Sequence, residues 1–271
     1  MPEGENQRRT AVRASATKRK TPSFEREIFE PHAPPGWPAN EILGAARKKE
    51  PHWAVVMAVD IRKSTILMRE AVDFTEFADA IGTFVDHAKE EVRKADGWFD
   101  KFTGDGFLAY WVFDEAADED DPLIEAANPA LDLAADLISY FNRISLPKFR
   151  ANSRNLPRRI GMSAGLDAGQ VYFANIGGDL TIVGPAVVGA VRMVTAAATP
   201  GETVANVFLG EYLLRRRDSV TKAVTEIQRD YCATKEYDEQ EIYRISVSSS
   251  AGVVGRLVSR ASAGTARHKG T

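Results

Sequence analysis

Two aspartates lie next to apolar segments and are the first candidates for chemistry. Asp60 follows the apolar run Trp53 to Val59, and Asp105 lies in a Thr-Gly-Asp-Gly turn between residues 98–102 and 107–113. Runs of this length predict strands, and a carboxylate beside buried strands needs a cation, a donor or a partner acid to offset its desolvation. If these strands are neighbours, the two carboxylates converge. Converging carboxylates can hold Mg²⁺ or Mn²⁺ ions, which prefer oxygen ligands.

The segment after Asp60 predicts a helix start, and with it a place for phosphate. Ile61, Arg62, Lys63, Ser64 and Thr65 lead from the strand into a helical pattern. The N-terminus of a helix offers free backbone N–H groups and the positive end of the helix dipole, and both favour an anion. Ser64 and Thr65 also fit a simpler role as N-terminal caps.

Regular elements must position these aspartates. Residues 98–113 predict a hairpin around Asp105, and the preceding helix is expected to open with the pair Asp73 and Glu76. That helix should end near residues 95–97, where Gly97 is expected to adopt the left-handed conformation. The acidic segment 114–121 predicts a solvated connection to a helix with apolar residues from 123 to 141.

The second half of the chain predicts more strands than helices. Strands are expected at 160–165 and 171–174, with a turn at 167–169 between them. A strand at 180–184 should lead into a helix with Pro185 in its first turn. Further strands are expected at 203–209 and 242–245. This order predicts an α+β fold, an α/β sandwich with a ferredoxin-like core in which helices cover a mostly antiparallel sheet.

Composition limits the class of protein. The 271 residues carry a formal net charge of −3, which gives no sign of a nucleic-acid or membrane partner. The single Cys232 excludes a disulfide framework, and the four histidines lack metal-ligand spacing. We expect a soluble cytoplasmic protein with a basic and Pro-rich arm at 1–50, one domain at 51–247 and a flexible tail at 248–271.

Several motifs occur in an order that resembles one family. They are Ala58-Val59-Asp60-Ile61, Lys101 to Gly106, Ile160 to Gly165 with Asn175-Ile176-Gly177, Thr181 to Gly184 with Arg192, Pro200-Gly201-Glu202, and Thr234 to Tyr237. Each motif alone is common, but the ordered set across residues 52–247 resembles the catalytic domain of class III nucleotidyl cyclases. Such enzymes join the ribose 3′-oxygen of a nucleoside triphosphate to its α-phosphorus and release pyrophosphate.

The resemblance implies a role for each matching residue. Asp60 and Asp105 would hold two Mg²⁺ or Mn²⁺ ions per site, with help from the Ile61 carbonyl. Arg192 would stabilise the transition state, and Lys235 would bind the triphosphate. The family's sites form across a head-to-tail homodimer, so these two cations would come from the partner chain. Further nucleotide-binding residues are expected at Ile61, Arg62, Ser64, Thr65, Lys101 and Thr181.

The expected base-reading pair is Lys101 and Thr181. Lysine only donates hydrogen bonds, so it suits an acceptor on adenine, cytosine or uracil, whereas the threonine hydroxyl can donate or accept. Guanine requires an acidic acceptor for its N1–H and amino group, which this pair lacks. The pair therefore argues against GTP and leaves ATP, CTP and UTP open.

Two departures from the family pattern narrow the resemblance. Val188 replaces the family asparagine one turn before Arg192, and loss of such a donor would reduce the rate by about 10²- to 10³-fold if nothing compensates. Arg62 to Thr65 replaces a small residue followed by Phe-Thr. This segment and Val187 to Met193 resemble the pyrimidine cyclases of the bacterial antiphage Pycsar system, which make cyclic UMP or cyclic CMP for an effector protein.

Three functions remain open from the sequence. The first is a pyrimidine cyclase acting on UTP, or on CTP, as a second-messenger synthase with a downstream cyclic-nucleotide-binding effector. The second is an ATP-specific adenylate cyclase. The third is a non-catalytic module for nucleotide binding or dimerisation, although such a module would have no need of a metal-binding acid pair.

Overall fold

The computed structural model describes residues 44–46, 48–113, 121–176, 179–197, 199–233 and 239–249. Most of the predicted arm at 1–50 and of the predicted tail at 248–271 lies outside these residues, as does the acidic segment 114–120. Lys235 also lies outside them.

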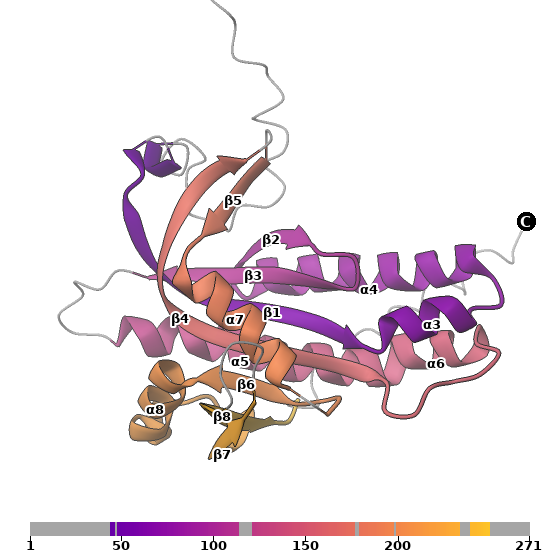
Figure 1. The fold of residues 1–271 in the computed structure, drawn as a ribbon. Helices are drawn as coiled ribbons and strands as arrows, with labels where there is room; N and C mark the ends of the chain where they lie inside the picture. The colour runs from indigo at the N-terminus through magenta and orange to yellow at the C-terminus, as the bar shows by residue number, and fades with distance from the viewer. Residues whose placement is uncertain are drawn as a thin grey trace, which may run out of the picture.

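A single mixed sheet organises the described residues (Figure 1). Its strands are β1 (Pro51–Arg62), β2 (Trp98–Phe102), β3 (Gly106–Phe113), β4 (Gly161–Ile176), β5 (Asp179–Val183), β6 (Thr203–Asn206), β7 (Val224–Cys232) and β8 (Gln240–Val247). The order is β2-β3-β1-β4-β6-β8-β7, and β5 pairs with β4. The pairs are antiparallel except for β4 with β6, which is parallel.

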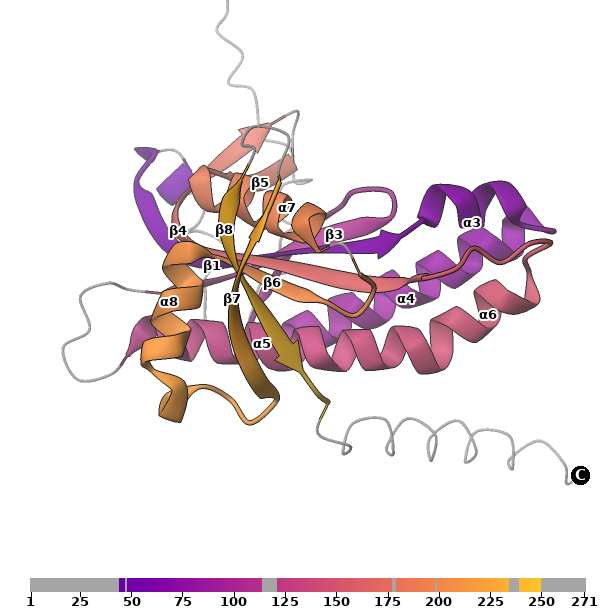
Figure 2. The same ribbon diagram turned by 60° about the horizontal axis from the view of Figure 1, so that its bottom comes forward.

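Helices cover both faces of this sheet (Figure 2). They are α3 (Ser64–Glu70), α4 (Phe74–Lys94), α5 (Pro122–Tyr140), α6 (Leu146–Ala151), α7 (Pro185–Ala196) and α8 (Val207–Arg215). Alternate residues of β1 face opposite sides because side chains alternate along a strand. Val55, Met57 and Val59 join the core beneath α4 and α5, whereas Ala54, Val56 and Ala58 pack with α7. The predicted α+β fold is confirmed.

The ends of α4 agree only in part with those predicted from the sequence. Asp73 caps the helix, and its carboxylate accepts from the N–H groups of Thr75 at 2.7 Å and Glu76 at 3.3 Å. The expectation that Gly97 adopts the left-handed conformation is wrong, because Asp96 adopts it instead, with φ 54°. Glycine is needed at 97 for a different reason, since a Cβ there would lie 2.6 Å from the Trp111 ring.

Two predicted strand boundaries are also wrong. β4 runs without a break from Gly161 to Ile176, so the expected turn at 167–169 does not form. Pairing with β1 continues through this segment, where Val56 lies opposite Asp167. The strand expected at 203–209 ends at Asn206, whose side chain accepts from Leu209 N–H at 3.0 Å and caps α8.

The far end of β4 and β5 form an arm that extends away from the rest of the sheet (Figure 1). Ile176 and Val183 on this arm are exposed. Gly184, with φ 150°, follows β5, and α7 then begins at Pro185 as predicted. Among the described helices, none is long and apolar enough to cross a membrane.

Candidate functional site

Strand pairing brings Asp60 and Asp105 to the same place. β1 lies beside β3, with Asp60 opposite Gly106. The Ile61 N–H donates to the Asp105 carbonyl at 3.1 Å, which fixes the turn against the end of β1. A Cβ at Gly106 would lie 1.9 Å from the Val59 carbonyl oxygen, so this close approach requires glycine. The expected convergence of the two aspartates is present.

Each carboxylate has a donor at the end of β1 or just after it. Arg62 Nη1 lies 3.3 Å from Asp60 Oδ2, and the Ser64 hydroxyl donates to Asp105 Oδ2 at 2.5 Å. The predicted capping role of Ser64 and Thr65 is wrong, because Lys63 is the N-cap residue of α3, with φ 63°. Ser64 is buried and Thr65 is exposed. The two residues are therefore placed differently, and only Ser64 contacts an acid of the site.

The acids fit a divalent cation. Burial raises the pKa of Asp60, the nearby Arg62 lowers it, and the charge of Asp105 raises it further. Asp105 and Asp60 thus repel each other, and a cation between them would relieve that repulsion. Carboxylate oxygens with the Ile61 carbonyl are the donor set that Mg²⁺ and Mn²⁺ prefer. Within the described ranges no cluster of three or more His, Cys, Asp or Glu side chains occurs, so a two-carboxylate site would need other oxygen ligands.

Arg62 also has unused donors. Its Nε and Nη2 atoms are buried, and neither has a hydrogen-bond partner among the described residues. A buried donor without a partner carries a desolvation cost, which an anionic ligand would offset. Arg62 follows Asp60 by two residues on β1, so both side chains leave the sheet on the face that α7 covers.

The two expected base-reading residues are in contact. Lys101 Nζ, from β2, donates to Thr181 Oγ1, from β5, at 2.7 Å. Thr181 is buried, whereas the Lys101 side chain is 47% exposed and can reach a ligand.

Sequence reasoning missed Asp100, the acid beside this pair. Its side chain is only 1% exposed. It accepts from the Thr181 hydroxyl at 2.8 Å and from the Ile182 N–H at 3.2 Å. Burial raises the pKa of Asp100, and these donors with Lys101 oppose that rise. The available signal was an acid inside the aromatic strand segment Trp98 to Phe102, but the β-bulge between Phe99 and Lys101 that places it was not predictable.

The remaining predicted residues are on α7 or outside the described residues. Arg192 is half-buried on α7, which packs on the same face of the sheet as Asp60 and Arg62. Val188, one turn earlier, is 49% exposed and supplies no hydrogen-bond donor. Lys235 lies outside the described ranges, so its expected contact with a triphosphate stays a prediction.

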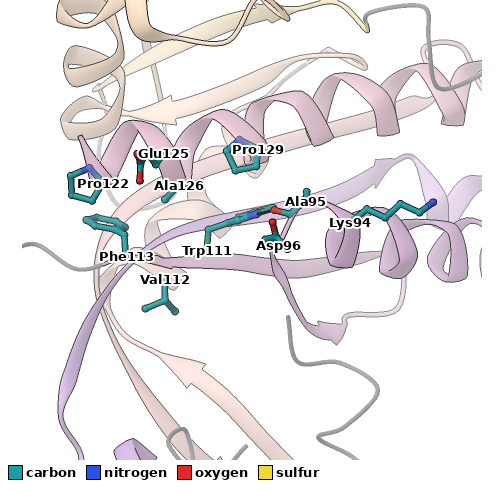
Figure 3. Close-up of a pocket in the computed structure, with 10 residues that line it drawn as sticks. All are labelled: Lys94, Ala95, Asp96, Trp111, Val112, Phe113, Pro122, Glu125, Ala126 and Pro129. Atoms are coloured by element: carbon teal, nitrogen blue, oxygen red, sulfur yellow. Dashed lines mark hydrogen bonds between the residues drawn. The ribbon is translucent and has the colours of Figure 1, made fainter. Parts of the chain in front are cut away.

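A sizeable cavity lies away from these residues (Figure 3). It has a volume of about 580 Å³ and lies between the end of α4, the end of β3 and the start of α5. Lys94, Trp111, Glu125 and Pro129 are among its lining residues, and none of the predicted site residues is. The candidate site therefore consists of the pair Asp60 and Asp105 and the hydrogen-bonded group Lys101, Thr181 and Asp100, and this cavity is not part of it.

Several solved structures with a similar fold are nucleotide cyclases. The adenylyl cyclase CyaB from P. aeruginosa aligns over 74% of this chain and 97% of its own, with 19% identity and a TM-score of 0.57. The guanylyl cyclase Cya2 aligns over 76% and 97%, with 16% identity and a TM-score of 0.54. The guanylate cyclase domain of RhGC from Catenaria anguillulae, in complex with GTP, aligns over 74% and 100%, with 16% identity and a TM-score of 0.54.

The chain therefore has the fold of class III nucleotidyl cyclase catalytic domains. No protein-family model and no curated protein sequence matches it. At these identities the comparison establishes the architecture, and the activity has to be argued from the site.

Proposed function

We propose that this protein is a nucleotidyl cyclase that converts a pyrimidine nucleoside triphosphate, UTP or CTP, to its 3′,5′-cyclic monophosphate and pyrophosphate. The main support is the convergence of Asp60 and Asp105 at the β1 and β3 ends of a cyclase fold. Ser64 and Arg62, each in contact with one of these acids, add donors at the same position.

The reaction requires the ribose 3′-oxygen to lose its proton and bond to the α-phosphorus while the bond from that phosphorus to the bridging oxygen of pyrophosphate breaks. Asp60 and Asp105, with the Ile61 carbonyl, would hold two Mg²⁺ or Mn²⁺ ions. When bound, these ions supply charge neutralisation at the phosphate oxygens and make the 3′-hydroxyl more acidic.

The cationic side chains have a separate task. Nε and Nη2 of Arg62, which have no partner among the described residues, suit oxygens of the triphosphate, because charge-assisted hydrogen bonds to phosphate would satisfy both donors. Arg192 and Lys235 would stabilise charge on the transferring and leaving phosphates, as the family resemblance implies. Since Val188 lacks a donor, Arg62 is the described residue best suited to compensate for the missing asparagine.

A homodimer with composite sites is part of the proposal. The arm of β4 and β5 and the outer face of α7 expose apolar side chains, including Ile176, Val188 and Val191. Exposed apolar side chains of this kind would be covered in a protein interface. In this arrangement Arg192 and Lys235 act in the partner's site.

The preference for pyrimidines rests on the sequence of two segments, residues 60–65 and 187–193. Lys101 with Thr181 supports a base that presents an acceptor to the ammonium group. A second-messenger role in antiphage defence, acting through a cyclic-nucleotide-binding effector in the cytoplasm, follows from the same resemblance and belongs to the proposal.

A substrate competition tests this function. Purified protein receives Mn²⁺ and an equimolar mixture of ATP, GTP, CTP and UTP, and mass spectrometry identifies the cyclic products. We expect cyclic UMP or cyclic CMP to dominate. Cyclic AMP as the main product would favour the adenylate cyclase instead, and nucleotide binding without any cyclic product would favour the non-catalytic module.

A further inference from the structure

The hydroxyl of Thr181 has a fixed hydrogen-bond polarity in this structure. Lys101 can only donate, so at 2.7 Å the Thr181 oxygen must accept from it. An ionised carboxylate can only accept, so at 2.8 Å Thr181 must donate its single proton to Asp100. The hydroxyl therefore has one lone pair left for a ligand and no proton.

Burial raises the pKa of Asp100, and the donors around its carboxylate oppose that rise and favour the ionised form that this arrangement needs. Three donors converge on its carboxylate, namely the Thr181 hydroxyl, the Ile182 N–H at 3.2 Å and the Lys101 ammonium at 3.5 Å. The side chain is 1% exposed, so it cannot itself contact a nucleotide base. Asp100 acts through its neighbour and is a positioning residue.

We propose that Asp100 makes Thr181 an obligatory hydrogen-bond acceptor and thereby selects the base of the substrate. The inference rests on the proposed function, because it assigns specificity within that site. Lys101 offers only donors and Thr181 only a lone pair, so a base must present an acceptor to Lys101 and an N–H to Thr181.

This requirement separates the two pyrimidines. Along the edge from position 4 to position 3, uracil presents a carbonyl acceptor and then an N–H donor, whereas cytosine presents an amino donor and then a ring-nitrogen acceptor. With Lys101 facing position 4 and Thr181 facing position 3 the pair matches uracil, and with the two reversed it matches cytosine, so a base held in one placement is selected. The structure thus implies discrimination between UTP and CTP. The residue types at positions 101 and 181 alone did not decide this, because a threonine hydroxyl can donate or accept.

Asp100→Asn reverses the polarity with little change in volume. The Ile182 N–H needs an acceptor, so the amide oxygen would face it and the amide N–H₂ would point at Thr181. Thr181 then accepts from residue 100 and from Lys101, and its proton is free to donate to the base. We expect the ratio of kcat/KM between the preferred and the other pyrimidine nucleotide to fall by about tenfold or more.

Matched variants separate this effect from a general disturbance. Thr181→Val removes the acceptor and should also lower the ratio, whereas Thr181→Ser keeps the hydroxyl and should preserve it. Asp132→Asn alters another carboxylate that accepts from a threonine hydroxyl, that of Thr221 at 2.5 Å, on an exposed surface. We expect this control to leave the ratio unchanged.

Calorimetry tests the inference without turnover. It measures how tightly the same variants bind α,β-methylene UTP and α,β-methylene CTP. Failure of the wild type to form any cyclic nucleotide would then contradict the proposed function alone. A wild type that binds both analogues equally, or a folded Asp100→Asn variant with an unchanged preference, would overturn the role of Asp100. If Asp100→Asn does not fold, an unchanged preference in Thr181→Val overturns it.

Discussion

Asp167 has a buried carboxyl group under α7 that no predicted function uses. It accepts from the Ala168 N–H at 2.7 Å, and its other oxygen faces Gly189, where a Cβ would lie only 1.6 Å away. Burial raises the pKa of Asp167 to about 7 from 3.8. Glycine at 189 therefore makes room for this acid beneath the helix that carries Val188 and Arg192.

The raised pKa of Asp167 sets the sign of a pH dependence. The folded chain retains this proton up to about pH 7, whereas the unfolded chain loses it near pH 4, so the free energy of unfolding falls as pH rises through this window. A shift of about 3 pH units at 1.36 kcal/mol per unit corresponds to about 4 kcal/mol.

Asp167→Asn removes this ionisation and should stabilise the protein at pH 8. We expect a gain of about 2 to 4 kcal/mol at pH 8 and little difference at pH 4.5, measured by urea unfolding. Asp79→Asn on the exposed face of α4 is the control and should show no such pH-dependent gain. An equal effect of Asp167→Asn at both pH values would contradict a neutral buried carboxyl group.

At the scale of elements, the sequence predicted what local chemistry determines. The Asp105 hairpin, the Asp73 cap and the Pro185 helix start all depend on residues close together in the chain, and all are present. The expected turn at 167–169 failed because Asp and Gly are local turn signals, whereas pairing with β1 extends the strand. β7 was not expected, since most of its side chains are exposed and it lacks an apolar pattern.

The same distinction between local signals and long-range strand pairing applies to the candidate site. Asp60, Asp105, Lys101 and Thr181 were found because each matches a motif, and the sheet brings them together in two pairs. Asp100 could not be predicted, because its orientation depends on the bulge in β2, and strand register is a property of the whole sheet.

Two helical glycines give a matched test of packing. A Cβ added at Gly82 in α4 would meet no neighbouring atom within 4 Å, whereas a Cβ at Gly210 in α8 would lie 2.2 Å from the Tyr243 ring. We expect Gly82→Ala to stabilise the protein by about 0.5 to 1 kcal/mol, because alanine is the better helix former. Gly210→Ala should destabilise it by about 1 to 3 kcal/mol through overpacking.

Thermal and urea unfolding of both glycine variants check this expectation. Because the two changes are chemically identical, opposite signs isolate the contact with Tyr243. Destabilisation by Gly82→Ala of the same size as that by Gly210→Ala would contradict the placement of α8 against β8.

At the scale of the whole molecule, the proposed dimer explains why apolar side chains remain outside the core. Val188 and Val191 on the outer face of α7 are 49% and 44% exposed, and the dimer would cover them. Phe208 on α8 is 50% exposed as well, but it lies outside the proposed interface and serves as the control. Val191→Glu should weaken dimerisation by about tenfold or more, because a charge would be buried in the interface. Phe208→Glu, outside the proposed interface, should leave dimerisation unchanged in sedimentation experiments.

Composite sites allow a complementation test of the same dimer. Arg192→Ala and Asp105→Ala should each inactivate the homodimer, but a mixed dimer would contain one site free of both changes. We expect mixing to restore up to about a quarter of the activity, since half of the dimers are mixed and each has one of two sites intact. No recovery in a mixture with proven subunit exchange would contradict sites formed across the interface.

The central claim is that Asp60 and Asp105 form the catalytic centre of a nucleotidyl cyclase. Its most direct test is the rate of 3′,5′-cyclic nucleotide and pyrophosphate formation with Mn²⁺ in the wild type, Asp60→Asn, Asp105→Asn and the exposed control Asp79→Asn. We expect the wild type and the control to form cyclic nucleotide and pyrophosphate from a pyrimidine triphosphate at the same rate. Each site variant should form them at least about 10²-fold more slowly. Wild-type protein that forms no cyclic product from any triphosphate, or site variants as fast as the control, would contradict the claim.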